Sequence, residues 1–153
     1  MKRKVIFLLS ILLFSLEAFA ATPPVNFTGM WTLNRAKSDA SPAGTPKKSA
    51  MKINQQAGRI EIWYYITDGL GDHDWGSNYT LDGKVNHNSW DGVEVKTSQG
   101  WDGNTLVFNV RRGANSEYKE RWSLSPDGKT LTIKRHTIFS HSSLTEKFVF
   151  DKQ

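Results

Sequence analysis

The stretch Asn26-Phe27-Thr28-Gly29-Met30-Trp31-Thr32-Leu33 decides the fold of this chain. With the two-residue period of a β-strand, one face carries Phe27, Gly29, Trp31 and Leu33, and the other carries Thr28, Met30 and Thr32. A glycine inside a strand marks a place where a second backbone or a bulky ring approaches closely. The stretch therefore predicts a strand with one apolar and one polar side, against which the rest of the chain packs.

The residues before this strand have the pattern of a secretory signal peptide. A basic start at Lys2, Arg3 and Lys4 precedes an apolar run over 5–16, and Ala18-Phe19-Ala20 supplies small residues for cleavage. The run is shorter than the roughly 20 residues that a membrane span needs. We therefore expect a signal peptide over 1–20, cleavage after Ala20, no membrane span after cleavage, and a periplasmic or secreted protein.

The remaining residues, 21–153, have the length of one domain. They contain no cysteine, so the core must stabilise the fold without disulfides. Loss of Lys2, Arg3, Lys4 and Glu17 lowers the formal net charge from +5 to +3. Nothing in this balance indicates a nucleic-acid partner, and we expect a monomer.

From Ala50 onward apolar and polar residues alternate almost without a break. Asp-Gly pairs at 82–83, 91–92, 102–103 and 127–128 separate the β-prone runs, and Asp-Gly is a strong hairpin signal. Strands are expected at 27–33, 50–55, 59–67, 75–81, 84–90, 93–100, 104–112, 117–125, 130–139 and 144–151, with one helical turn at 34–38 and a loop over 39–49. Eight to ten antiparallel strands joined by short turns predict an all-β, up-and-down barrel, because closure hides the strand edges. A two-sheet sandwich is the alternative.

The run Phe27-x-Gly29-x-Trp31-x-Leu33 resembles the first-strand signature of lipocalins and fatty-acid-binding proteins, the calycin superfamily. Residues 27–38, followed by hairpins with "LDGK" and "SPDGKTLTI", resemble more closely the secreted lipocalin-like proteins of bacteria. The resemblance implies that Trp31 packs across one end of the barrel and that the interior binds a small molecule. Two features of fatty-acid-binding proteins do not appear here: a helical lid after the first strand, which 39–49 cannot form, and an Arg-x-Tyr pair near the C-terminus.

The interior of the predicted barrel is apolar with a few ionisable groups. If Ser125 pairs with Thr130 across the turn, Glu120 lies opposite Arg135, Trp122 opposite Ile133 and Tyr118 opposite Thr137. Apolar walls with a few convergent polar groups are typical of small-molecule pockets, and a guanidinium can hold an anionic group. The predicted ligand-binding residues are Tyr64, Phe108, Arg112, Tyr118, Glu120, Trp122 and Arg135, and the partner is a small apolar or amphipathic molecule.

Three alternatives stay open. Glu120 and Arg135 could form an ion pair that only satisfies itself. Tyr118, Glu120 and Arg135 also match the residue types of lipocalin-like decarboxylases, although the spacing motif of that family is missing, and the sequence favours a binding protein over such a decarboxylase or isomerase. Finally, large inward side chains could fill the barrel and leave no cavity of about 300 Å³, in which case the outer surface, for example Trp63 and Tyr65, would bind a partner.

No metal or cofactor is expected. The four histidines, His73, His87, His136 and His141, lack the spacing of a zinc site, and we place His73 and His141 in loops.

Overall fold

The computed structural model describes residues 25–39 and 46–153, apart from residues 91 and 115. The predicted signal peptide and residues 40–45 of the predicted loop lie outside the described residues. The elements in chain order are β1 (Gly29–Leu33), η1 (Arg35–Lys37), β2 (Lys48–Gln56), β3 (Arg59–Asp68), β4 (Gly71–Thr80), β5 (Asn86–Trp90), β6 (Val93–Asp102), β7 (Thr105–Arg112), β8 (Ser116–Leu124), β9 (Thr130–Phe139) and β10 (Ser143–Lys152). No helix in the described part of the chain is long and apolar enough to cross a membrane.

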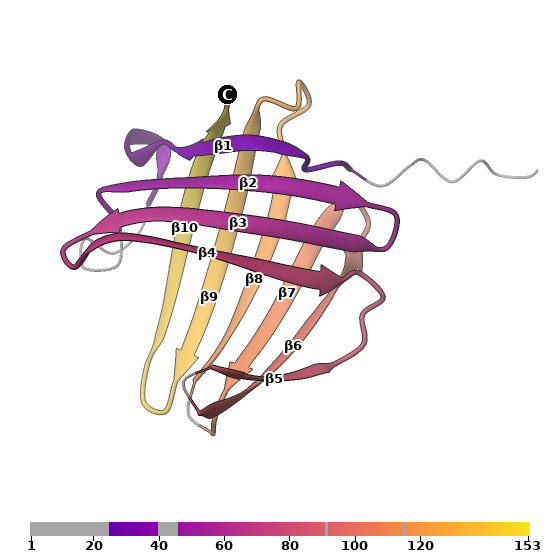
Figure 1. The fold of residues 1–153 in the computed structure, drawn as a ribbon, viewed down its shortest axis with the longest axis vertical. Coiled ribbons are helices and arrows are strands. Elements are labelled where there is room, and N and C mark those ends of the chain that lie inside the picture. Colours follow the sequence, from indigo (N-terminus) through magenta and orange to yellow (C-terminus); the bar gives the residue numbers. More distant parts are fainter. Residues whose placement is uncertain (1–24, 40–45, 91, 115) are drawn as a thin grey trace, which may run out of the picture.

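The ten strands form one antiparallel sheet in the order β4-β3-β2-β1-β10-β9-β8-β7-β6-β5. Apart from β4 and β5, strands that follow each other in the chain are neighbours in the sheet, and β1 joins the two halves by pairing with β2 and β10. The sheet curls so that β1–β4 cross over β6–β10 (Figure 1). Within the described residues β4 and β5 are the two edges and do not pair with each other. The prediction of an all-β up-and-down barrel is confirmed, with an opening between β4 and β5 where the ladder does not close.

The one large boundary difference concerns β4. The segment before Trp75 was expected to interrupt the sheet, but β4 begins at Gly71 and pairs with β3 along its whole length, so His73 lies in a strand opposite Ile66. The chain reverses at Gly69-Leu70, where Asp68 accepts a hydrogen bond from the Leu70 backbone N–H at 2.7 Å. This part of β4 has no apolar alternation of its own. It is a strand because its backbone pairs with β3.

Trp31 anchors the first strand in the core of the barrel. Its side chain is fully buried in a cluster with Phe27, and its indole Nε1 donates a hydrogen bond to the Phe27 carbonyl at 2.8 Å. Phe27 in turn stacks on Trp101, with 6.0 Å between the ring centroids, and meets Trp122 edge-on at 6.1 Å. The Lys152 ammonium lies 5.3 Å from the Trp31 ring centroid. Trp31 thus ties the first strand to the core and to the last residues of the chain.

Gly29 occupies a backbone conformation that other residues avoid, with φ of 149°. A Cβ here would lie 2.7 Å from Lys152 Cε. The closest neighbour is therefore a lysine side chain, and the ring of Trp31 also approaches, with its Nε1 3.7 Å from the Cβ position.

We expect Gly29→Ala to lower the free energy of unfolding by about 1–3 kcal/mol, because a Cβ makes this φ unfavourable. Urea denaturation of the two proteins measures the difference. Gly69→Ala is the matched control, since no atom lies within 4 Å of its Cβ position. Equal midpoints for the two variants would contradict the prediction.

The strands β7–β10 extend beyond the cover of β1–β4 at the end of the molecule that carries the β9–β10 turn (Figure 1). Arg112, Phe139 and Leu144 share the inward-facing alternation, yet all three are exposed. Arg112 and Phe139 lie in one row, each opposite Ser116. Arg112 was predicted to line the interior, and that prediction is wrong, because it lies at the end of β7, where the sheet extends beyond β1–β4.

Candidate functional site

A row of residues crosses the inner wall from β6 to β10. The cross-strand register is Gln99–Phe108–Glu120–Arg135–Glu146. The predicted pairing of Glu120 with Arg135 and of Trp122 with Ile133 is confirmed, and the turn closes as expected with Ser125 opposite Thr130. Four of the five residues in this row are polar, although the wall around them is apolar.

Glu120 and Arg135 form a close ion pair. Arg135 Nε and Nη2 lie 2.7 and 2.6 Å from Glu120 Oε1, and the indole Nε1 of Trp122 donates to Glu120 Oε2 at 2.8 Å. The guanidinium also lies 5.3 Å from the Tyr118 ring centroid and 5.1 Å from that of Phe148. Burial alone would lower the pKa of Arg135, but the charge of Glu120 and its hydrogen bond outweigh this and raise the pKa. Both oxygens of Glu120 are thus occupied by protein donors, which favours an ion-pair role over an acid–base role.

A cavity of about 260 Å³ lies beside this pair, between β1–β4 and β8–β10. Aromatic rings form much of its wall: Tyr64, Trp75, Trp122, Phe148 and Phe150. Aliphatic side chains complete the wall, and its polar groups come from Ser49, Glu120 and Arg135. The volume is slightly below the 300 Å³ that marks the lower end of drug-sized pockets. The interior is therefore partly filled, with room for a small molecule.

The structure separates the seven predicted site residues into three groups. Tyr64, Glu120, Trp122 and Arg135 line the cavity together. Tyr118 reaches it indirectly through Arg135, and Phe108 packs behind it against Trp122, with 4.8 Å between the ring centroids. Arg112 lies apart from the cavity. It is in the same cross-strand row as Phe139, and Phe139 is four residues from Arg135 on β9, so the two rows are about 13 Å apart along the strand.

Three tyrosines around the ion pair are held in their neutral form. Burial raises the pKa of Tyr64 well above its ordinary value, and nearby Tyr79 and Glu120 add to the effect. Burial and the charge of Glu120 also raise the pKa of Tyr118, against an opposing effect of Arg135. The pKa of Tyr79 is raised by burial, although a hydrogen bond with Ser77 offsets part of the change.

We expect these tyrosines to make the protein sensitive to alkali. Their folded-state pKa values exceed the unfolded value of about 10, so the stabilisation is complete below pH 10 and is lost as pH rises toward the folded values. Urea midpoints at pH 8, 9.5 and 11 should fall steeply over the last interval. Tyr64→Phe should make this fall less steep. Tyr65→Phe, at the neighbouring exposed position, is the matched control and should leave the fall unchanged. A fall that is the same in both variants would contradict the assignment to Tyr64.

Gln99 and Glu146 were not among the predicted site residues. Gln99 is fully buried, and in the described structure neither its amide nitrogen nor its amide oxygen hydrogen-bonds to a protein group, which also holds for the Thr97 hydroxyl. Glu146 is 6% exposed and adjoins Arg135 across β9 and β10. The alternation Val95, Thr97, Gln99, Trp101 could have revealed Gln99 as inward-facing, since its strand was expected at 93–100.

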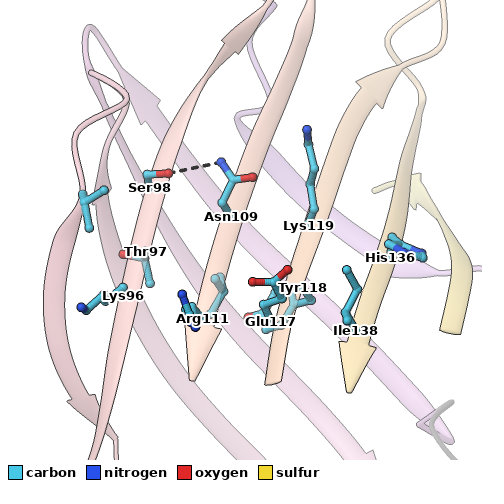
Figure 2. A pocket seen from close by; sticks show the side chains of 12 residues that line it. Lys96, Thr97, Ser98, Asn109, Arg111, Glu117, Tyr118, Lys119, His136 and Ile138 are labelled. Carbon is cyan, nitrogen blue, oxygen red and sulfur yellow. Dashed lines mark hydrogen bonds between the residues drawn. The ribbon is translucent and has the colours of Figure 1, made fainter. Parts of the chain in front are cut away.

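A second depression, of about 370 Å³, lies on the outer wall over β6–β9. Figure 2 shows Lys96, Arg111, Lys119 and His136 around it, with a hydrogen bond of 3.2 Å from Asn109 to Ser98 in its floor. These side chains alternate outward from the sheet, on the opposite side from Glu120 and Trp122. It is larger than the interior cavity, but it is a surface groove in which charged and polar side chains face solvent.

The other candidates from the sequence lie on the outside as well. Trp63 and Tyr65 are 42% and 41% exposed, and Trp63 covers Gly76, whose Cβ position lies 3.0 Å from its ring. His73 pairs with Asp68, His87 with Glu94, and His136 contacts Thr145, so these three histidines lie in separate settings.

No protein-family model matches the sequence, and no curated protein matches it with significance. Similar solved structures include the wild-type fluorescent protein UnaG, with a TM-score of 0.62 at 11% identity over 83% of this chain and 97% of that chain. A Schistosoma mansoni fatty acid binding protein in complex with arachidonic acid gives 0.59 at 14% identity, over 83% of this chain and 96% of that chain. Zebrafish ileal bile acid-binding protein complexed with cholic acid gives a TM-score of 0.57 at 15% identity, over 83% of this chain and 98% of that chain. This chain shares the β-barrel fold of the fatty-acid-binding and lipocalin-like proteins.

Proposed function

We propose that this protein is an exported barrel that binds a small hydrophobic or amphipathic molecule in its interior. The observation that carries the proposal is the cavity of about 260 Å³ beside the Glu120–Arg135 pair. Its aromatic and aliphatic wall offers apolar burial, and a few polar groups, chiefly Glu120 and Arg135, face into it, which is the usual composition of a ligand site.

The shared fold supports the proposal. Two of the similar structures are complexes with amphipathic molecules, arachidonic acid in one and cholic acid in the other. The resemblance of residues 27–38 to secreted lipocalin-like proteins of bacteria supports export. If export is right, the intact mass of the protein recovered from the periplasm or medium of a bacterial host should match a chain that begins at Ala21.

Binding can be measured with N-phenyl-1-naphthylamine, an uncharged fluorescent probe of apolar sites. We expect its fluorescence to rise on titration with the protein, with saturation at one site. Ser49→Phe should weaken probe binding by about tenfold or more, because the new ring would occupy the cavity.

Lys52→Phe is the matched control. Lys52 lies on the same strand as Ser49 but is exposed and outside the cavity lining. Unchanged binding in Lys52→Phe and weakened binding in Ser49→Phe would place the probe inside. Absence of binding by the unmodified protein would overturn the proposed function.

A further inference from the structure

We propose that the interior cavity selects uncharged amphiphiles such as alcohols, and that Glu120 excludes carboxylates by occupying the guanidinium of Arg135. This inference rests on the proposed function and adds the charge class of the ligand and the residue that sets it.

The formal charges that line the cavity cancel. Among the described lining residues only Glu120 and Arg135 are charged, and they neutralise each other, with Arg135 Nε and Nη2 2.7 and 2.6 Å from Glu120 Oε1. A charged ligand would therefore enter an apolar wall that offers it no unpaired counter-charge. Moving an ion out of water on those terms is costly, whereas an uncharged ligand loses much less.

Arg135 is the group that a ligand carboxylate would seek, and it is already engaged. Besides its two contacts with Glu120, its central carbon lies over the rings of Tyr118 and Phe148, 5.3 and 5.1 Å from their centroids. A ligand carboxylate would have to displace the carboxylate of Glu120, which is only 6% exposed. The displaced group would then be a buried charge without its partner, and this makes the exchange unfavourable.

Glu120 is also held in place from its other side. Its Oε2 accepts a hydrogen bond of 2.8 Å from the indole Nε1 of Trp122, and this indole is itself buried. Glu146 acts on Arg135 through its charge as well, but it is not among the described residues that line the cavity. The carboxylate that a ligand meets at Arg135 is thus that of Glu120.

Neutral hydroxyl groups offer partners for the polar end of an uncharged ligand. Ser49 and Tyr64 both line the cavity. Burial raises the pKa of Tyr64 well above its ordinary value, so its hydroxyl stays neutral at pH 7.5 and can donate or accept a hydrogen bond. The charges of Glu120 and Arg135 both act on this hydroxyl, so it lies near the ion pair. An alcohol can pair with such groups without bringing a charge into the cavity.

Competition between two ligands with the same apolar chain tests the selection. Decanol and decanoate are titrated at pH 7.5 into the complex of the protein with N-phenyl-1-naphthylamine, decanol below its solubility limit and decanoate below its micelle concentration. We expect decanol to displace the probe at a concentration about tenfold or more below that of decanoate, because decanoate must lose its hydration without gaining a counter-charge. Decanoate that competes as well as decanol or better would overturn the charge inference and leave the proposed function standing. Failure of the probe and of both ligands to bind would overturn both.

Glu120→Gln tests the role of Glu120 itself. The amide keeps the size of the side chain and can still accept from Trp122, but it no longer neutralises Arg135. Decanoate should therefore bind about tenfold more tightly, through charge-assisted hydrogen bonds to the freed guanidinium, whereas decanol should change by less than about threefold. Glu117→Gln, the same substitution at an exposed acid on the outer side of β8, is the matched control and should change neither ligand. Equal decanoate affinities in Glu120→Gln and Glu117→Gln would contradict the role of Glu120.

Glu120→Leu/Arg135→Leu decides the inference if Glu120→Gln does not fold. Since the two charges neutralise each other, removing both should change the affinity for decanoate relative to decanol by less than about threefold. A selective loss of decanoate binding in the double variant would mean that Arg135 holds the ligand carboxylate in the unmodified protein, and this would overturn the inference.

Discussion

Replacing Trp31 by alanine is expected to lower the free energy of unfolding by about 3–5 kcal/mol, the usual cost of removing a large buried aromatic side chain. Trp31 is fully buried, its indole donates a hydrogen bond to the Phe27 carbonyl, and the ammonium of Lys152 lies over its ring. Its loss would open a cavity in the core, next to the place where β1 joins the two halves of the sheet. Urea denaturation followed by circular dichroism measures the change.

Two variants separate burial from the hydrogen bond. Trp31→Phe keeps a ring but leaves the buried Phe27 carbonyl without its indole donor, so we expect an intermediate loss. Trp63→Ala is the matched control, because Trp63 is 42% exposed on the outer face. If the losses of Trp31→Ala and Trp63→Ala differed by less than about 1 kcal/mol, Trp31 would not anchor β1 in the core in the way described.

Where one face of a strand is apolar and the other polar, alternation in the sequence was sufficient to predict the strand and its pairing. The pairing of β8 with β9 followed from matching Leu124 with Leu131 and Trp122 with Ile133, because a slip of one residue would move every apolar side chain to solvent. The same reasoning placed Glu120 beside Arg135. The start of β4 was missed because Asp72, His73 and Asp74 carry no apolar period, and backbone pairing to β3 alone makes this part a strand.

The candidate site was predicted only in part, for a different reason. Alternation tells which side of the sheet a residue faces, but it does not tell how far the opposite strands extend. Arg112 and Phe139 therefore face inward by pattern and are exposed in the structure, whereas Phe148 lines the cavity and is buried because β1–β4 lie opposite it. Nor does alternation show that both oxygens of Glu120 are occupied, since this depends on the rotamers of Arg135 and Trp122.

Replacing Glu120 by leucine is expected to lower the free energy of unfolding by about 2–4 kcal/mol. This is somewhat below the cost of breaking a fully buried pair, because Arg135 is partly exposed. The variant leaves the guanidinium without its carboxylate and leaves Trp122 Nε1 without its acceptor. The loss of stability should thus come mainly from the Arg135 guanidinium that remains without Glu120, not from the missing carboxylate alone.

The double variant Glu120→Leu/Arg135→Leu distinguishes these sources. If the stranded guanidinium is the main cost, removing it should recover most of the lost stability, since apolar replacement of both partners of a buried pair is often nearly neutral. The exposed pair Arg121–Asp102, with 2.8 Å between its charged atoms, is the matched control, and its single variants should each cost less than about 1 kcal/mol. Strictly additive losses at positions 120 and 135 would mean that the two side chains are not coupled, and would remove the physical basis for treating Arg135 as already engaged when a ligand arrives.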